Sequence, residues 1–177
     1  MKLYKHKNHT EYVWVEEGEL KLLTNHIKNN IKNPSFGLCH GVRNGWEVSK
    51  LKELLNINVI GTDISPTANE FENVIQWDFH ETNEDWNNVD FIYSNSFDHS
   101  YDPQKCLDVW MDSINRKTGV CYIHWMNSNF RKMDAADCFA ASRLDYRKLF
   151  NKKYRVVKEF YKYKTRVIFA IKHREIG

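Results

Sequence analysis

The stretch that decides the fold is Tyr154–Ile171, which reads YRVVKEFYKYKTRVIFAI. It contains two runs rich in β-branched and aromatic residues, 154–161 and 164–171, which only two residues separate. So short a connection permits only an antiparallel pair of strands. A sheet built solely from strand–helix–strand units would end in a parallel strand, so this chain is expected to close its sheet with an antiparallel hairpin.

Upstream of the hairpin, short apolar runs alternate with helical patterns. Strands are predicted at 36–40, 57–60, 74–77, 89–94 and 120–125. Helix starts are predicted at Asn44 (with Glu47 as a capping-box partner), at Ser65–Pro66 and at Asp102–Pro103, and a last helix over 135–150. Strands separated by helices build a parallel sheet covered on both faces. We therefore predict an α/β fold, a doubly wound and mostly parallel seven-stranded sheet with an antiparallel C-terminal hairpin.

The 177 residues are expected to form a single domain. Residues 1–33 combine a predicted strand, 10–15, with a helix whose Leu20, Leu23, Ile27 and Ile31 recur at three- and four-residue steps. Asn33-Pro34-Ser35 breaks this pattern. We interpret 1–33 as an N-terminal accessory segment and 34–172 as the core of the domain.

The composition excludes several classes of protein. Lys and Arg number 26 against 23 Asp and Glu, and a net charge of +3 is too mild to imply nucleic acid. Membrane association is not expected either, because no run approaches the roughly 18 apolar residues of a membrane span. The basic N-terminus lacks the apolar stretch of a secretory signal. With four cysteines and no Cys-x-x-Cys pair, the chain is expected to be cytoplasmic, with reduced and buried thiols. The sequence does not decide whether the chain forms a homo-oligomer.

Residues that suit a ligand follow the predicted strands, and in open α/β sheets ligands bind beyond the carboxyl ends of the strands. Gly41-Val42-Arg43-Asn44-Gly45 leads into a helix N-terminus, which favours an anion. A glycine in such a turn lets the backbone approach a ligand closely. Asp63 follows Gly41 by 22 residues (63 minus 41), near the spacing of about 20 that suits a carboxylate on ribose hydroxyls. Asp78 ends the third strand and could accept from an adenine amino group. Together these features favour an adenosine-type ligand.

The stretch Asp90–Pro103, DFIYSNSFDHSYDP, resembles the fourth-strand signature of class I S-adenosylmethionine-dependent methyltransferases, particularly their small-molecule branch. In that signature a hydrophobic strand runs to Ser, an acidic-His pair and Asp-Pro. The resemblance covers roughly residues 36–172 and implies a Rossmann-like methyltransferase fold, whose seventh strand is antiparallel. It also implies S-adenosylmethionine as the cofactor.

The resemblance implies roles for individual residues. Gly41 and Gly45 would cradle the methionine end of the cofactor, Asp63 with its neighbour Ile64 would hold the ribose, and Trp77 and Asp78 would border the adenine. The floor near the sulfonium would be lined by Ser94, Asn95 and Ser96.

Two positions depart from the family pattern. The family usually has an acidic residue two before the first glycine, where this chain has Cys39, and a central glycine in the turn, where this chain has Arg43. Arg43 either pairs with the cofactor carboxylate, a charge-assisted contact, or blocks the site.

Methyl transfer needs a base only when the acceptor is a hydroxyl or a protonated amine, and His99 and His124, at predicted strand ends, are the candidates. The polar segment 126–134 is expected to border the acceptor, with Trp125, Asn127 and Arg131 as candidate contacts. Cys39, His40, His99 and His124 also permit a metal site, but no tight ligand spacing favours one and none is expected.

The sequence thus favours an S-adenosylmethionine-dependent methyltransferase, a transferase acting on a small molecule. Two alternatives remain open. One is a non-catalytic nucleotide- or cofactor-binding module on the same fold. The other is an RNA or protein methyltransferase, with Lys2, Lys5, Lys7 and the Lys-rich hairpin as a weak basic face.

Overall fold

The computed structural model describes residues 13–127, 138–162 and 165–175. These residues form one seven-stranded sheet in the order β3-β2-β1-β4-β5-β7-β6. The strands are β1 (Phe36–His40), β2 (Asn58–Asp63), β3 (Val74–Gln76), β4 (Phe91–Ser94), β5 (Val120–Met126), β6 (Arg155–Lys162) and β7 (Arg166–Lys172). The first five pair in parallel, whereas β7 runs antiparallel to both β5 and β6. The predicted fold class and its closing hairpin are therefore confirmed.

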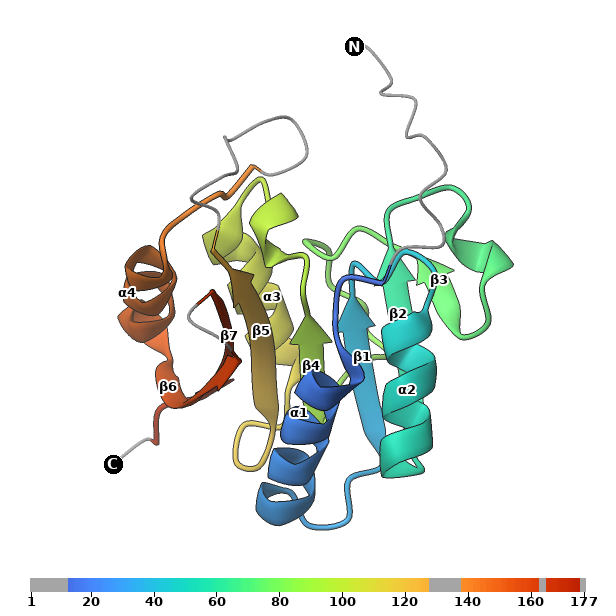
Figure 1. Ribbon diagram of the computed structural model, residues 1–177, viewed down its shortest axis with the longest axis horizontal. Helices are drawn as coiled ribbons and strands as arrows, with labels where there is room; N and C mark the ends of the chain where they lie inside the picture. The colour runs from blue at the N-terminus through green and yellow to red at the C-terminus, as the bar shows by residue number, and fades with distance from the viewer. Residues whose placement is uncertain (1–12, 128–137, 163–164, 176–177) are drawn as a thin grey trace.

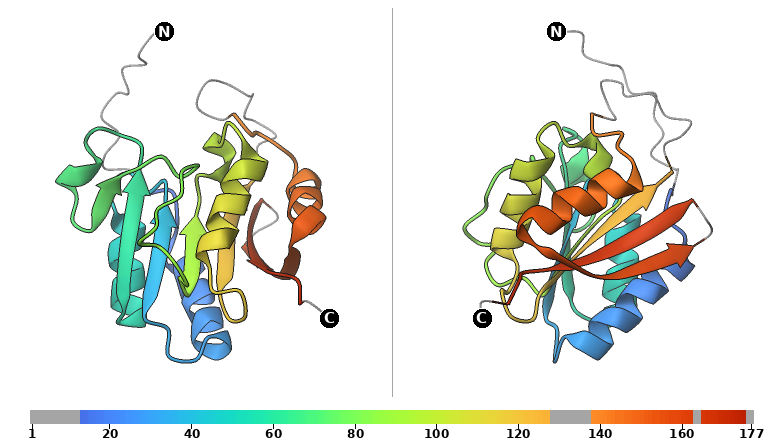
Figure 2. Two further views of the ribbon diagram at one scale, coloured as in Figure 1. Left: turned by 180° about the vertical axis from the view of Figure 1, so that it is seen from behind. Right: turned by 90° about the vertical axis from the view of Figure 1, so that its left-hand side faces the viewer.

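Four helices cover the two faces of this sheet. Helices α1 (Glu17–Asn30) and α2 (Trp46–Leu55) lie in front of the sheet in Figure 1, and α3 (Pro103–Ser113) lies in front of it when seen from behind (Figure 2, left). Helix α4 (Arg143–Lys153) shares the face of α3, because both contribute to the same hydrophobic cluster. The α1 and α2 side chains pack into a second cluster on the other face. Two apolar layers thus hold the strand ends in fixed positions.

Three of the expected helix starts are wrong in detail. The run after Ser65–Pro66 forms only a 3₁₀ turn, η1 (Ala68–Glu70), because β3 pairs with β2 only a few residues later. Helix α2 has Gly45 as its N-cap in the left-handed conformation (φ 73°), so Asn44 and Glu47 form no capping box there. Helix α4 begins at Arg143 rather than at 135, because Ser142 and Asp145 form its capping box.

The structure also tests the predicted start of α3, the apolar face of α1 and the predicted strand 10–15. Asp102 caps α3 with Pro103 in the first turn, and α1 buries Leu20, Leu23 and Ile27 as predicted. Val13–Val15 form no strand, and the rest of the predicted strand 10–15 lies outside the described residues. No helix among the described residues is long and apolar enough to cross a lipid bilayer.

Candidate cofactor site

The turn after β1 and the carboxyl end of β2 are held together by Asp63. Its Oδ2 accepts from the Arg43 backbone N–H at 2.8 Å, and its Oδ1 accepts from the Ser65 N–H at 2.9 Å. Each carboxylate oxygen has two lone-pair directions, so Asp63 keeps capacity for hydroxyl groups of a ligand. The side chain is thereby oriented in advance, at the position expected for ribose recognition.

Gly41 and Gly45 have the positive φ that the turn requires, 71° and 73°. A Cβ on Gly41 would lie 2.5 Å from Ser96 Cβ, so the β1 turn and the residues after β4 are in close contact there. Arg43 also has positive φ, 47°, and its side chain is exposed. The residue that replaces the family's central glycine therefore takes the left-handed backbone itself and presents its amide to Asp63.

Side chains beyond β4 fasten this edge of the sheet. Ser94 Oγ donates to the His40 carbonyl at 2.8 Å and accepts from the Ser96 N–H at 3.0 Å. Ser96 Oγ lies 2.8 Å from the Gly41 carbonyl oxygen and 3.1 Å from Asn95 Oδ1. Ser94 is buried, so it joins β4 to β1, whereas Asn95 and Ser96 are partly exposed at the predicted floor.

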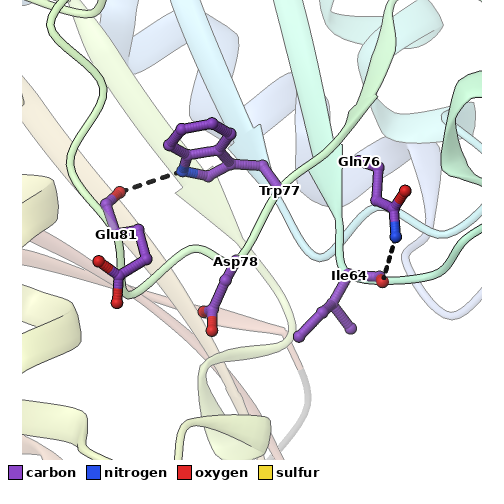
Figure 3. A pocket seen from close by; sticks show the side chains of 5 residues that line it. All are labelled: Ile64, Gln76, Trp77, Asp78 and Glu81. Carbon is purple, nitrogen blue, oxygen red and sulfur yellow. Dashed lines mark hydrogen bonds between the residues drawn. The ribbon is translucent and has the colours of Figure 1, made fainter.

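An open hollow of about 310 Å³ lies next to Asp63, between the ends of β2 and β3. Figure 3 shows its lining, which consists of Ile64, Gln76, Trp77, Asp78 and Glu81. Trp77 Nε1 donates to the Glu81 carbonyl at 3.1 Å, which fixes the indole at the border of the hollow. Three residues predicted around the nucleoside, Ile64, Trp77 and Asp78, therefore line one hollow.

Asp78 is oriented by a network that sequence reasoning did not identify. Its Oδ1 accepts from the His80 N–H at 2.9 Å and lies 2.8 Å from His80 Nδ1, and His80 Nε2 lies 2.7 Å from Ser100 Oγ. Tyr101 stacks on the His80 ring, with centroids 3.7 Å apart, and donates to Asp78 Oδ2. Although burial opposes it, the hydrogen bonds from His80 and Tyr101 lower the pKa of Asp78, so its carboxylate stays ionised.

The two candidate bases lie in different surroundings. His99 is in the short turn η2 (Phe97–His99) after β4, is 43% exposed, and has Nε2 3.9 Å from Asp98 Oδ1. The His124 ring is fully buried, with Nε2 3.3 Å from Glu19 Oε1 of α1. Because His124 points into the α1 side of the sheet, its ring packs against the buried Glu19 side chain, and His99 is the accessible candidate.

The predicted acceptor residues are only partly described. Trp125 is buried, its Nε1 donates to the Ala141 carbonyl at 3.0 Å, and it borders a small crevice at the ends of β4 and β5 together with Asn95 and Tyr146. The Asn127 N–H donates to the Thr165 carbonyl at 2.7 Å. Arg131 and most of segment 126–134 lie outside the described residues.

The residues considered for a metal lie apart. His40 is buried, stacks on Trp110 and bonds Thr62 at 2.8 Å, and burial lowers its pKa to about 3. Burial raises the pKa of the Cys39 thiol well above its usual range, so the thiol is neutral. Within the described ranges, no three His, Cys, Asp or Glu residues are arranged to hold a metal ion.

Solved structures share this overall fold. OxaC, crystallised with SAH and oxaline, superposes with a TM-score of 0.67 at 14% identity, over 85% of this chain and 46% of OxaC. A SAM-dependent methyltransferase from Aquifex aeolicus gives 0.65 at 14% identity, over 89% of this chain and 98% of that one. The 1,6-didemethyltoxoflavin-N1-methyltransferase of Burkholderia thailandensis, with S-adenosylhomocysteine bound, gives 0.69 at 12% identity, over 92% and 81%.

This chain has the methyltransferase fold. The likeness lies in the path of the backbone, since no family model matches the sequence and no curated protein matches it. The chain spans less than half of the length of OxaC. Within the methyltransferase fold, Asp63 and the Gly41–Gly45 turn lie at the carboxyl ends of adjacent strands, where open α/β sheets bind ligands.

Proposed function

We propose that this chain binds S-adenosylmethionine and transfers its methyl group to a small-molecule acceptor. The observation that carries the proposal is the position of Asp63. It is fixed by two backbone amides between the glycine turn and the hollow lined by Ile64, Trp77 and Asp78. In this position Asp63 would accept from ribose hydroxyls beside a nucleobase-sized hollow, next to the glycine turn.

The residues present fit the proposed cofactor. Asp63 would accept from the ribose hydroxyls, and Asp78, held by His80, would accept from the adenine amino group. Ile64 and Trp77 provide apolar surface for the base, and the left-handed backbone of Gly41 and Gly45 shapes the turn that would border the methionine end. Asn95 and Ser96 would border the sulfonium. The bound cofactor supplies an electrophilic methyl group, so alignment of the acceptor accounts for most of the catalysis.

A small acceptor is supported by the fold comparison. OxaC was crystallised with oxaline and the Burkholderia enzyme with 1,6-didemethyltoxoflavin. In this chain the crevice that His124, Trp125 and Tyr146 border lies at the ends of β4 and β5, and at about 10 Å³ it would have to widen to admit an acceptor. For an acceptor that must lose a proton, His99 is the proposed base, because it is exposed at the same edge.

Calorimetry with S-adenosylmethionine and S-adenosylhomocysteine tests the proposal. We expect micromolar binding of both, because product and cofactor share the adenosine and methionine parts. Binding followed by label transfer from methyl-tritiated cofactor to a panel of hydroxyl, amine and ring-nitrogen acceptors would establish the enzyme. Binding without transfer to any acceptor would support the non-catalytic module, and binding of neither ligand would overturn the proposal.

A further inference from the structure

Glu47 is a buried carboxylate at the carboxyl edge of the sheet. It lies in the first turn of α2, two residues after Gly45, and is only 6% exposed. Asn95 Nδ2, from the segment after β4, donates to its Oε1 at 3.4 Å. Glu47 is therefore enclosed between the glycine turn and the predicted floor of the cofactor site.

The orientation of Asn95 is set by its neighbours. Ser96 Oγ lies within hydrogen-bonding distance of both the Gly41 carbonyl and Asn95 Oδ1. When Ser96 donates its one hydroxyl proton to Asn95 Oδ1, the Asn95 amide presents its NH₂ group to Glu47. A continuous chain of polar contacts thus runs from the Gly41 turn to the Glu47 carboxylate.

Glu47 has no cationic partner within the described part of the chain, although a buried carboxylate is costly without one. Arg43 and Asp63 are the charged groups whose fields reach it, with opposite effects, and Cys39 and Tyr93 are the neutral titratable groups beside it. Burial raises the pKa of Glu47 to about 7. The protein therefore keeps a buried acid group, bonded by Asn95 and by its own backbone N–H, next to the turn where the methionine end of the cofactor is proposed to lie.

We propose that Glu47 binds the α-ammonium group of the methionine end of S-adenosylmethionine, with Asn95 holding its carboxylate in position. This inference rests on the proposed function. It assigns to a helix residue a contact with the cofactor's only nitrogen cation, and it makes the amino group a determinant of affinity. An ammonium group next to Glu47 would compensate the buried charge through charge-assisted hydrogen bonds.

A pair of ligands and a pair of variants isolate this contact. The ligands are S-adenosylhomocysteine and its deamino analogue, which lacks only the α-amino group. The variants are Glu47→Gln, which keeps the size of the side chain, and Glu53→Gln, a matched control on the exposed face of the same helix. Calorimetry should show that Glu47→Gln weakens S-adenosylhomocysteine at least tenfold and the deamino analogue less than twofold. Glu53→Gln should change neither.

The outcomes separate the two proposals. If the wild type binds neither ligand, the proposed function fails. If the wild type binds S-adenosylhomocysteine and Glu47→Gln weakens both ligands equally, or neither, the cofactor proposal stands and the ammonium contact is overturned.

A second measurement uses only the wild-type protein, so it tests the contact even if Glu47→Gln does not fold. An ionised Glu47 is required for the contact, so the affinity for S-adenosylhomocysteine should rise about tenfold from pH 6 to pH 8. The deamino analogue reports every other titration that affects binding, including that of the exposed His99, and should show no such rise. Equal pH profiles for the two ligands would overturn the assignment.

Discussion

The backbone N–H of Arg43 donates a 2.8 Å hydrogen bond to Asp63 Oδ2, which joins the turn after β1 to the end of β2. The same carboxylate accepts from Ser65, so one side chain organises two loops. Arg43 occupies a left-handed backbone conformation that usually favours glycine. The hydrogen bond from its amide to Asp63 helps to stabilise this strained conformation. The candidate cofactor site is therefore ordered by its own protein contacts.

Replacing Asp63 by Ala should weaken S-adenosylhomocysteine binding by about 1–3 kcal/mol, because charge-assisted hydrogen bonds to the ribose would be lost. Calorimetry measures this directly. Asp112→Ala, an exposed carboxylate on α3, is the control and should leave binding unchanged. An unaltered affinity in Asp63→Ala would remove the ribose assignment.

Adding a methyl group at Gly41 should destabilise the protein by about 2 kcal/mol, because a Cβ at φ 71° would also collide with Ser96. Gly18→Ala is the matched control. Gly18 lies inside α1, where a Cβ would meet only the flexible end of Lys162 at 3.3 Å, and the change should stabilise the helix by up to about 1 kcal/mol. Chemical denaturation measures the free energy of unfolding of both variants. Equal changes at Gly41 and Gly18 would contradict the close packing described for the turn.

Glu47 should make the free protein less stable as the pH rises. Its pKa is raised to about 7 in the folded state, so between about pH 4.5 and 7 the unfolded chain releases a proton that the folded chain keeps. Stability therefore falls across that interval, by about 3 kcal/mol. Glu47→Gln removes this effect and should raise the melting temperature at pH 8 more than at pH 5. A variant with the same gain at both pH values would contradict the buried carboxylate.

The Glu19–His124 pair should support stability. Although burial opposes it, the nearby His124 imidazole, the hydrogen bond from the Glu16 backbone N–H and the Arg166 guanidinium at 3.0 Å lower the pKa of Glu19 to about 2. Its contribution is then present above about pH 4.5 and is lost as the pH falls toward 2. Glu19→Gln should cost about 3 kcal/mol at pH 7, because it breaks a buried pair. Glu17→Gln, which removes an exposed contact with Lys21, should leave the free energy of unfolding nearly unchanged.

This pair also distinguishes the two candidate bases. His124→Gln should lower the free energy of unfolding, as Glu19→Gln does, whereas His99→Gln should leave it unchanged because His99 is exposed. Denaturant titrations of the two variants provide the measurement. An unchanged free energy of unfolding in His124→Gln would contradict a packing role for His124 and would again make it a candidate base.

Asp78 should confer selectivity for adenine. Wild-type protein is expected to bind S-adenosylhomocysteine about tenfold more tightly than S-inosylhomocysteine, because the inosine carbonyl cannot donate to a carboxylate. Asp78→Asn should lower the ratio of the two affinities, and Asp85→Asn, at an exposed position, should leave the ratio unchanged. A ratio that Asp78→Asn leaves intact would exclude the proposed amino contact.

Much of the fold could be predicted from the sequence because it depends on local patterns. The strand runs from residue 36 onward, the Asp102–Pro103 helix start and the short link between the last two strands all depend on nearby residues, and the structure confirms them. Predicted helix starts were wrong where tertiary contacts compete with local signals. Gly45 caps α2 with its backbone conformation, and the Ser65–Pro66 signal produces one short turn before β3 pairs with β2.

The candidate site divides in the same way. Sequence spacing placed Asp63, Ile64, Trp77 and Asp78 at strand ends, and these residues lie around or beside one hollow. The same spacing does not assign the roles of Glu47 and His124, because it predicts Glu47 as a capping partner and His124 as a candidate base. Whether a carboxylate or imidazole is buried depends on residues distant in the chain, such as Asn95 for Glu47 and Glu19 for His124.

The sequence by itself determined the order of strands and helices, the antiparallel closure and the residue types at the strand ends, because hydrophobic period and turn chemistry act over a few residues. Only the tertiary structure decided which of those side chains are buried, which partners they have and how they ionise. Desolvation and hydrogen bonding are set by the packing of segments that are far apart in the sequence.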